Sequence, residues 1–469
     1  MLIQSFYADA LAHISYLLIG SNNAAVIDPK RDVDDYIQEA KKQGVKITHI
    51  LITHSHADFV SGHIELAKKT GAKIYAPEKS GFEFDHIPLK EGDTINIDHI
   101  KIDVLEVPGH TPDHVAYVIT DLSRGELPVA VFTGDTLFVG DVGRPDLFPD
   151  IKDQLAENLY HSLFDKLLKL PDFVEIYPAH GAGTLCGKAL AAKRTSTIGY
   201  EKLYNKALQF SSKEEFIKNL LDGMPEAPDH FRRSSMINAK GPITTDKLPK
   251  PVPMTPDEFE KHINNGAIVV DIRSYIAWSG GHIPGSYSLD YTCMPFSTFA
   301  GWILPPDKNV LIVADNEKDV EIATIKLRRV GIDYEIGYLD GGMNAWAKSG
   351  KPVKSYKLIS PQQLEEQLKE GKDLFILDVR SPQEYETGKI EGSVNIPAPA
   401  IRQKYNILPK NKEILAVCGL GPRAAMSVSI LEQKGYENLS ILSGGMTSWN
   451  QYHNKQPACS MWTIKLLYQ

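Results

Sequence analysis

The stretch Thr53-His54-Ser55-His56-Ala57-Asp58-Phe59 follows an apolar run that predicts a β-strand over 49–53. Three later stretches repeat this arrangement, with His or Asp beside Gly or Pro at the end of an apolar run: Pro108–His114, Thr133–Phe138 and Tyr177–Gly181. Imidazole and carboxylate groups together suit Zn, Fe or Mn. Because functional groups often sit in loops at strand ends, the four stretches predict a metal site in a layered α/β domain.

Taken in this order, the four stretches resemble those of the metallo-β-lactamase superfamily, over about Met1–Gly241. The resemblance implies an αββα sandwich for this part of the chain. The local patterns agree with a mixed α/β domain, since apolar runs at 24–28, 49–53 and 102–106 predict strands and the segments 34–43 and 62–69 are predicted as helices.

Phe59 distinguishes this chain from the dinuclear zinc members of the superfamily, which carry a further His at that position. An apolar ring there deprives a second metal of an imidazole ligand, which disfavours a dinuclear hydrolase. Mononuclear iron relatives can retain that His, so Phe59 supports a mononuclear site without deciding it.

The segment that continues from Gly134 resembles the persulfide dioxygenases of this superfamily, with Gly143-Arg144-Pro145-Asp146 as the characteristic stretch. The resemblance implies one Fe(II) per chain, bound by His54, His110 and Asp135. Two His and one carboxylate form a facial triad that leaves positions open for O₂ and substrate.

The same resemblance implies supporting roles around the metal. It places His56, Asp58 and His180 behind the ligands, where they would orient them. Arg144 is expected to bind an anionic part of the thiol substrate, and an ordinary structural ion pair is the alternative for this residue. Cys186 follows six residues after His180 and is interpreted as a buried structural thiol, with an approach to the metal site as the alternative.

The C-terminal half contains an internal repeat. Asp271–Ser274 recurs 107 residues later as Asp378–Ser381, and Gly341-Gly342-Met343 recurs 103 residues later as Gly444-Gly445-Met446. Short β-branched runs alternate with helical patterns in each copy; the first copy has runs at 267–271, 310–314 and 335–339 and a predicted helix over 319–330. This alternation predicts two α/β domains with parallel sheets covered by helices.

In the second copy, the loop Cys418-Gly-Leu-Gly-Pro-Arg423 lies between an apolar run at 414–417 and a predicted helix over 424–432. Backbone N–H groups at a helix N-terminus favour a thiolate and bound anions, and Arg423 adds positive charge. The loop, together with the upstream Asp378-Val-Arg380, resembles that of rhodanese sulfurtransferases. This implies that Cys418 and Arg423 are catalytic and that Cys418 carries a sulfane sulfur.

The first copy lacks this chemistry. With the 103-residue offset, Asp315 corresponds to Cys418 and Val320 to Arg423, so the nucleophile and the Arg are both absent. We therefore predict that the first copy is catalytically inactive. Cys293 lies outside this loop and is interpreted as a structural thiol.

A Pro-rich stretch at 242–256 predicts an extended linker. Three domains are expected: 1–245 of the persulfide dioxygenase type, 246–355 as an inactive rhodanese-like domain, and 356–469 as an active rhodanese domain.

Composition argues against several other classes of protein. The 469 residues carry a formal net charge of −8, unlike the basic footprint of a nucleic-acid binder. The sequence has no run of about 18 apolar residues, so no membrane span is expected. The four cysteines are too scattered for a disulfide framework, and a cytoplasmic location is predicted.

We therefore expect an enzyme of sulfide detoxification that oxidises a low-molecular-weight thiol persulfide with O₂ to sulfite. A coupled sulfurtransferase activity would interconvert sulfite and persulfide with thiosulfate and thiol, in either direction. The resemblance also implies a homo-oligomer. Two alternatives stay open: a thioester hydrolase like glyoxalase II, and a sulfur-binding or docking protein in which turnover is incidental.

Overall fold

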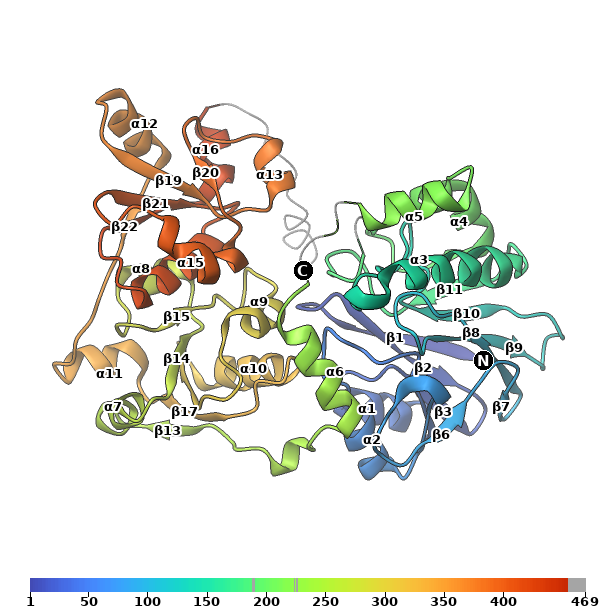
Figure 1. The fold of residues 1–469 in the computed structure, drawn as a ribbon. Coiled ribbons are helices and arrows are strands. Elements are labelled where there is room, and N and C mark those ends of the chain that lie inside the picture. Colours follow the sequence, from blue (N-terminus) through green and yellow to red (C-terminus); the bar gives the residue numbers. More distant parts are fainter. Residues whose placement is uncertain (188–189, 223, 225–226, 454–469) are drawn as a thin grey trace. The chain divides into compact units, whose positions relative to one another are not determined.

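The computed structural model describes residues 1–187, 190–222, 224 and 227–453. The chain forms two compact units, each described by itself below (Figure 1). The first contains Met1–Leu248 with Arg328–Gly331, and the second contains Pro249–Leu327 and the chain from Ile332 onward.

The first unit is built on two six-stranded sheets. One sheet has the order β1 (Leu2–Ala8), β2 (His13–Ile19), β3 (Asn23–Ile27), β4 (Lys46–Leu51), β5 (Lys73–Pro77) and β6 (Ile87–Leu89). The other has the order β12 (Ser196–Thr197), β11 (Glu175–Pro178), β10 (Ala130–Gly134), β9 (Val115–Asp121), β8 (Ile100–Glu106) and β7 (Thr94–Ile97).

Helices cover the outer face of each sheet. The helices of this unit are α1 (Asp34–Lys42), α2 (His63–Thr70), α3 (Lys152–His161), α4 (Ile198–Tyr204), α5 (Lys213–Leu221) and α6 (His230–Lys240). Of these, α5 packs on α3, and α6 contacts the loop that follows β4. Tyr36 of α1 packs with Val26 on the first sheet, and Leu159 of α3 packs with Val131 on the second. The opposite faces of the two sheets meet in a third cluster, which includes Tyr16. The layer order of helices, sheet, sheet and helices confirms the expected αββα sandwich.

The predicted strands of this unit are confirmed with small shifts at their ends. The strand expected over 24–28 is β3, which ends at Ile27 because Asp28 turns into the left-handed region with φ of +50°. This turn directs the Asp28 carboxylate to the loop that begins at Thr53, where it accepts hydrogen bonds from the backbone N–H and the hydroxyl.

The second unit contains two five-stranded sheets in which every strand pair is parallel. The first copy has the order β13 (Val252–Met254), β17 (Glu335–Leu339), β16 (Val310–Val313), β14 (Ile268–Asp271) and β15 (Tyr287–Ser288). The second copy has the order β18 (Lys357–Ile359), β22 (Leu439–Leu442), β21 (Glu413–Val417), β19 (Leu374–Asp378) and β20 (Val394–Asn395). The identical order confirms the repeat.

Helices alternate with these strands in both copies, as predicted. The first copy contains α7 (Pro256–Asn264), α8 (Tyr275–Gly280), α9 (Phe296–Ile303), α10 (Glu317–Arg328) and α11 (Gly342–Lys348). The second contains α12 (Pro361–Lys369), α13 (Pro382–Glu386), α14 (Ile401–Lys404), α15 (Pro422–Gln433) and α16 (Gly445–Tyr452). None of the helices in the described ranges is long and apolar enough to cross a membrane.

The Pro-rich stretch at 242–256 is a linker over only part of its length. Val252–Met254 forms β13, which pairs with β17 as the edge strand of the first copy's sheet. An edge strand tolerates Pro253 because one side of its backbone has no partner strand. The prediction of a linker is therefore wrong for these residues.

A substitution in α7 tests the core of the first copy. Phe259 is fully buried among Val269, Leu311 and Trp346. We expect Phe259→Ala to lower the free energy of unfolding of this domain by about 3–5 kcal/mol, because it leaves a cavity that the core cannot refill. Hydrogen exchange of the β14 and β16 amides should measure the loss. Lys261→Ala, on the exposed face of the same helix, is the control, and equal protection in both variants would contradict this packing.

Candidate metal and sulfur-transfer sites

Three loops of the first unit bring the predicted metal ligands together. His54 follows β4, His110 follows β8 and Asp135 follows β10, and all three side chains are buried. The Nε2 atoms of His54 and His110 lie 3.8 and 3.4 Å from Asp135 Oδ2. Among the described residues, this oxygen has no hydrogen-bond partner. A buried carboxylate oxygen without a partner, facing two imidazole nitrogens, fits a metal cation.

Hydrogen bonds on the far side of each imidazole orient the two His ligands. His110 Nδ1 lies 2.8 Å from the Arg144 carbonyl oxygen, so Nδ1 carries the proton and Nε2 is left as a ligand. His54 Nδ1 lies 2.8 Å from Thr53 Oγ1. Thr53 uses its only hydroxyl hydrogen to donate to Asp28, so it accepts from His54 and again leaves Nε2 for the metal.

His180 bridges two buried carboxylates behind the ligands. Its Nδ1 lies 2.6 Å from Asp135 Oδ1, and its Nε2 lies 2.8 Å from Asp58 Oδ2. Burial alone would lower the pKa of His180, but the two carboxylates raise it well above its ordinary value. Burial would likewise raise the pKa of Asp135, but His180 holds it below its usual range. The structure thus places Asp58 and His180 where they can orient Asp135.

His56 lies beside the ligands rather than among them. Its ring centroid is 4.1 Å from that of His54, and its Nε2 lies 2.9 Å from Asp28 Oδ1. Asp28 therefore contacts the loop at both Thr53 and His56, a role that the sequence analysis missed. Its position at the end of an apolar run was the available signal.

His114 was also missed, although it lies within one of the four stretches. Its Nε2 accepts a hydrogen bond of 2.9 Å from the Asp135 backbone N–H, and its ring stacks on His54 at 4.5 Å. Burial lowers the pKa of His114 to about 3, so the ring is neutral and can accept. Gly134 makes room for it, because a Cβ at Gly134 would lie 2.4 Å from this ring.

Arg144 is buried, and its guanidinium contacts other groups of the protein. It donates to both carboxylate oxygens of Asp146 at 2.7 Å and to the Leu185 carbonyl at 3.0 Å. Its own carbonyl orients His110. This geometry matches the alternative of a structural ion pair, and the role in substrate binding stays a prediction.

Phe59 is fully buried at the position where dinuclear members carry His. Its ring centroid lies 4.0 Å from that of His13 and 4.7 Å from that of His56. Nevertheless, Asp58, His180 and Cys186 form a second group with donor atoms close enough to hold a metal ion. Cys186 is buried, and burial raises the pKa of its thiol well above the ordinary value.

The second candidate site is the loop between β21 and α15. The Gly421 backbone N–H donates to Cys418 Sγ at 3.0 Å. Arg423 forms two hydrogen bonds of 2.7 Å with the two carboxylate oxygens of Glu384. The sequence analysis missed Glu384, which also forms a capping box with Ser381 at the start of α13.

The glycine pairs of the repeat show how the two loops correspond. Gly342 and Gly445 both have φ of +55°. A Cβ at Gly445 would lie 2.2 Å from the Cys418 carbonyl oxygen, and a Cβ at Gly342 would lie 3.1 Å from that of Ala314. Ala314 therefore corresponds to Cys418, which corrects the assignment of Asp315 from the 103-residue offset.

Strand register supports this correction. Asp271 pairs with Val313 in the first copy, and Asp378 pairs with Val417 in the second, so Ala314 and Cys418 each follow the paired residue. Helix α10 then begins three residues after Ala314, whereas α15 begins four residues after Cys418. The first copy's loop is one residue shorter, but its segment from the start of the helix to the second glycine of the pair is two residues longer. Ala314 is therefore 28 residues before Gly342, whereas Cys418 is 27 before Gly445, which is why the offset of 103 misplaced the site. Like Asp315, Ala314 has no thiol, so the first copy has no cysteine nucleophile at the corrected position either.

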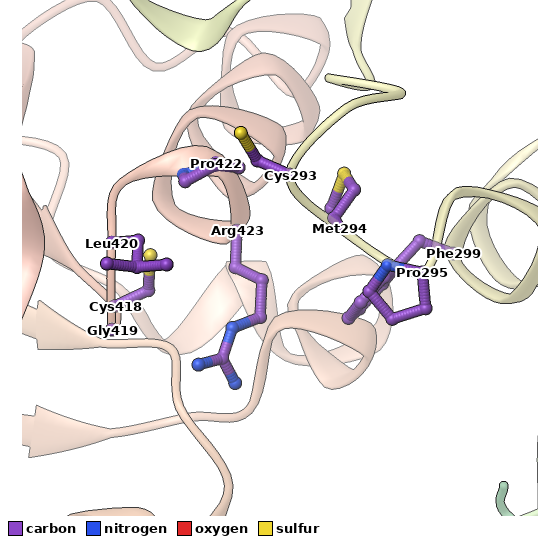
Figure 2. Close-up of a pocket in the computed structure, with 9 residues that line it drawn as sticks. All are labelled: Cys293, Met294, Pro295, Phe299, Cys418, Gly419, Leu420, Pro422 and Arg423. Carbon is purple, nitrogen blue, oxygen red and sulfur yellow. The ribbon is translucent and has the colours of Figure 1, made fainter. Parts of the chain in front are cut away.

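A pocket in front of Cys418 is lined by both copies, as Figure 2 shows. Its volume is about 370 Å³, including the part open to solvent. The second copy contributes Cys418, Gly419, Leu420, Pro422 and Arg423, and the first contributes Cys293, Met294, Pro295 and Phe299. Cys293, interpreted above as structural, is exposed and lines this pocket.

The first copy also supports the loop directly. Tyr275 packs against Gly421, where a Cβ would lie 2.4 Å from the tyrosine ring, and its hydroxyl accepts from the Gly444 backbone N–H at 3.1 Å. His282 Nε2 lies 3.0 Å from a carboxylate oxygen of Glu432 in α15. These contacts make the two copies one structural unit around Cys418.

Comparison with known families agrees with this architecture. The model of the metallo-beta-lactamase superfamily matches residues 8–180, and that of the rhodanese-like domain matches residues 255–349 and 360–452. A crystal structure of a metallo-beta-lactamase from Staphylococcus aureus is 35% identical, with a TM-score of 0.65, and covers 72% of this chain and 98% of its own.

Among characterised relatives, hydroxyacylglutathione hydrolase GloC of Haemophilus influenzae is 32% identical over 211 residues, which are 40% of this chain and 89% of that protein. Persulfide dioxygenase ETHE1 of Mus musculus is 33% identical over 200 residues, which are 42% of this chain and 71% of that protein. The chain therefore belongs to the metallo-β-lactamase superfamily and carries two rhodanese-like domains after that domain. Its N-terminal part is similar both to hydrolases and to a persulfide dioxygenase.

Removal of the central carboxylate should abolish metal binding. Groups behind the ligands contribute about 10–100-fold to metal affinity, so we expect a larger loss for Asp135→Asn, which removes a ligand charge. Elemental analysis after dialysis against a weak chelator should find no bound metal in this variant. Asp150→Asn, at an exposed position, is the control. Metal retained by Asp135→Asn would contradict the site.

The contact between Arg423 and Glu384 should make stability depend on pH. Burial would raise the pKa of Glu384, but Arg423 lowers it below 4.5. The ion pair therefore contributes fully above pH 4.5, and its contribution is lost as pH falls through the lowered pKa. We expect Glu384→Gln to lower the thermal unfolding temperature of the second unit at neutral pH.

The difference from the wild type should shrink on acidification below pH 4.5, in scans of the full chain at several pH values. Glu386→Gln, which changes an exposed carboxylate of the same helix, controls for net charge. A difference that stays constant down to acid pH would contradict the ion pair.

Proposed function

We propose that the first unit is a mononuclear non-heme iron persulfide dioxygenase. The observation that carries this proposal is the convergence of His54, His110 and Asp135 around an otherwise unpartnered carboxylate oxygen. Phe59, in place of a second imidazole, supports one metal per chain. The reaction is R–S–SH with O₂ and water giving R–SH and sulfurous acid, which ionises to sulfite.

The residues of the chain provide ligand geometry, charge and exclusion of water. The bound Fe(II) would supply the O₂ chemistry that protein side chains cannot perform. Thr53 and the Arg144 carbonyl hold the two imidazoles with Nε2 toward the metal. His180 forms hydrogen bonds with both Asp135 and Asp58 and so holds Asp135 in place. Its positive charge compensates the negative charges of these two carboxylates. The ligand side chains are buried, which shields these three side chains from bulk water.

We further propose that the second rhodanese-like domain is a sulfurtransferase and that the first is inactive. Cys418 would carry a sulfane sulfur as Cys418–S–SH, and sulfite would attack the outer sulfur to give thiosulfate and the free Cys418 thiol. The Gly421 N–H contact with Sγ supports this role, since it favours negative charge on the sulfur that leaves. The reverse direction, from thiosulfate to a persulfide that feeds the iron site, uses the same groups.

A thioester hydrolase is the second candidate. It is favoured by the second donor group, Asp58, His180 and Cys186, and by the similarity to hydroxyacylglutathione hydrolases. Such an enzyme would use two metals, so the metal count separates the two functions. One iron per chain supports oxygenation, and two zinc ions per chain support hydrolysis.

Oxygen uptake tests the main proposal. Anaerobically purified, iron-loaded protein should consume O₂ on addition of glutathione persulfide and release sulfite and thiosulfate. His110→Ala should lose the uptake because it removes a ligand, whereas Cys418→Ser should keep the uptake and shift the product toward sulfite. Iron content is measured in each sample. No uptake with several thiol persulfides, despite bound iron, would overturn the dioxygenase and favour the hydrolase.

A further inference from the structure

The pocket in front of Cys418 contains a second thiol, that of Cys293 in the loop before α9 (Figure 2). Cys418 is 1% exposed, whereas Cys293 is exposed to solvent, and both are free cysteines. A single pocket is thus lined by one buried and one accessible thiol. Packing does not explain a cysteine at an exposed position, and the pocket offers a chemical explanation.

The surroundings of the two cysteines differ, and this difference predicts which thiol reacts first with a sulfur donor. Thr292 donates its hydroxyl hydrogen to Asp290 at 2.7 Å, so at 3.3 Å it accepts from the Cys293 S–H. Partial burial and the Asp290 carboxylate raise the pKa of Cys293, which therefore rests as a protonated thiol. Cys418 instead receives a backbone N–H and lies near Arg423. A sulfur donor that enters the pocket should load Cys418 first.

The burial of Cys418 limits which acceptors can reach it. Sulfite is small enough to enter the pocket, but the apolar wall of Met294, Pro295 and Phe299 narrows the approach for a thiol on a large molecule. The exposed Cys293 meets no such limit. A persulfide on Cys418 also extends about 2 Å further into the pocket than the thiol does, because it adds one S–S bond.

We propose that Cys293 is a second sulfur-carrying thiol, which takes the sulfane sulfur from Cys418 and presents it to protein thiols that cannot enter the pocket. This inference rests on the proposed sulfurtransferase function of Cys418. Cys293 first loses its proton to water, and its thiolate forms a bond to the outer sulfur of Cys418–S–SH while the bond between that sulfur and Cys418 Sγ breaks. Cys418 leaves as a thiolate and the transferred sulfur keeps its proton, giving Cys293–S–SH. The step needs no oxidant or reductant.

Peptide mass spectrometry of the full chain tests this relay. The protein is incubated with thiosulfate, quenched with an alkylating reagent and digested, and persulfide is quantified on the Cys418 and Cys293 peptides. Wild-type protein should carry label on both. Cys418→Ser and Cys418→Ala should both leave Cys293 unlabelled, because thiosulfate does not load an ordinary thiol. Lys261→Ala, at an exposed position in α7, is the control and should label as the wild type does.

A kinetic measurement complements the labelling. After removal of thiosulfate, reduced serum albumin is added as a probe with a protein thiol. In Cys293→Ser, the sulfur should remain on Cys418 longer than in the wild type, and transfer to albumin should be lost.

The outcomes distinguish a failure of the relay from a failure of the proposed sulfurtransferase function. Label on Cys418 with none on Cys293 overturns the relay and leaves the sulfurtransferase in place. Label on Cys293 in both Cys418 variants also overturns the relay, since Cys293 would then load by itself. No label on either cysteine in the wild type overturns the sulfurtransferase function and the relay together.

Discussion

The buried carboxylate of Asp135 requires hydrogen-bond partners and a compensating positive charge, and the loops of the first unit are arranged around this requirement. One of its oxygens is paired with His180, and the other faces His54 and His110 with no hydrogen-bond partner among the described residues. A charged oxygen buried without a partner is costly unless a cation compensates it. The loops after β4, β8 and β10 therefore form a site whose charge balance depends on a metal. His114 can accept a hydrogen bond from the Asp135 backbone because Gly134 has no side chain to collide with the His114 ring.

In the second unit, two glycines that allow close contact with the backbone support the Cys418 loop. Gly445 allows α16 to begin directly against the Cys418 carbonyl, and Gly421 allows the ring of Tyr275 to lie on the loop. The loop thus contacts α16 of its own domain and Tyr275 of the first copy. The first copy lacks a nucleophile at Ala314, yet it supplies part of the wall around Cys418. The pocket in front of Cys418 is therefore incomplete without the first copy.

The sequence predicted those features that are local in the chain. Motifs at the ends of apolar runs located the residues that converge at the candidate metal site, and the spacing of two landmarks identified the repeat. Contacts between distant segments were not predictable in this way. Asp28 and Glu384 act on residues 25 and 39 positions away, and no pattern within either segment shows the pairing. Arg144 illustrates a further limit, since the sequence shows its charge but not that Asp146 already neutralises it. The offset of 103 failed at Ala314 because the first copy has one more residue than the second between this position and the Gly-Gly pair, a difference that is visible only when the strands are paired.

The edge strand β13 has a consequence for how the protein behaves at high concentration. Pro253 lies at the centre of this strand and cannot donate to β17, so its side of the backbone faces away from the sheet. The open edge therefore lacks one of the N–H groups that a strand from another molecule would need for pairing. Proline at an exposed edge is one of the devices that prevent sheets from joining end to end. The same stretch that connects two domains thus protects the protein against aggregation through this sheet.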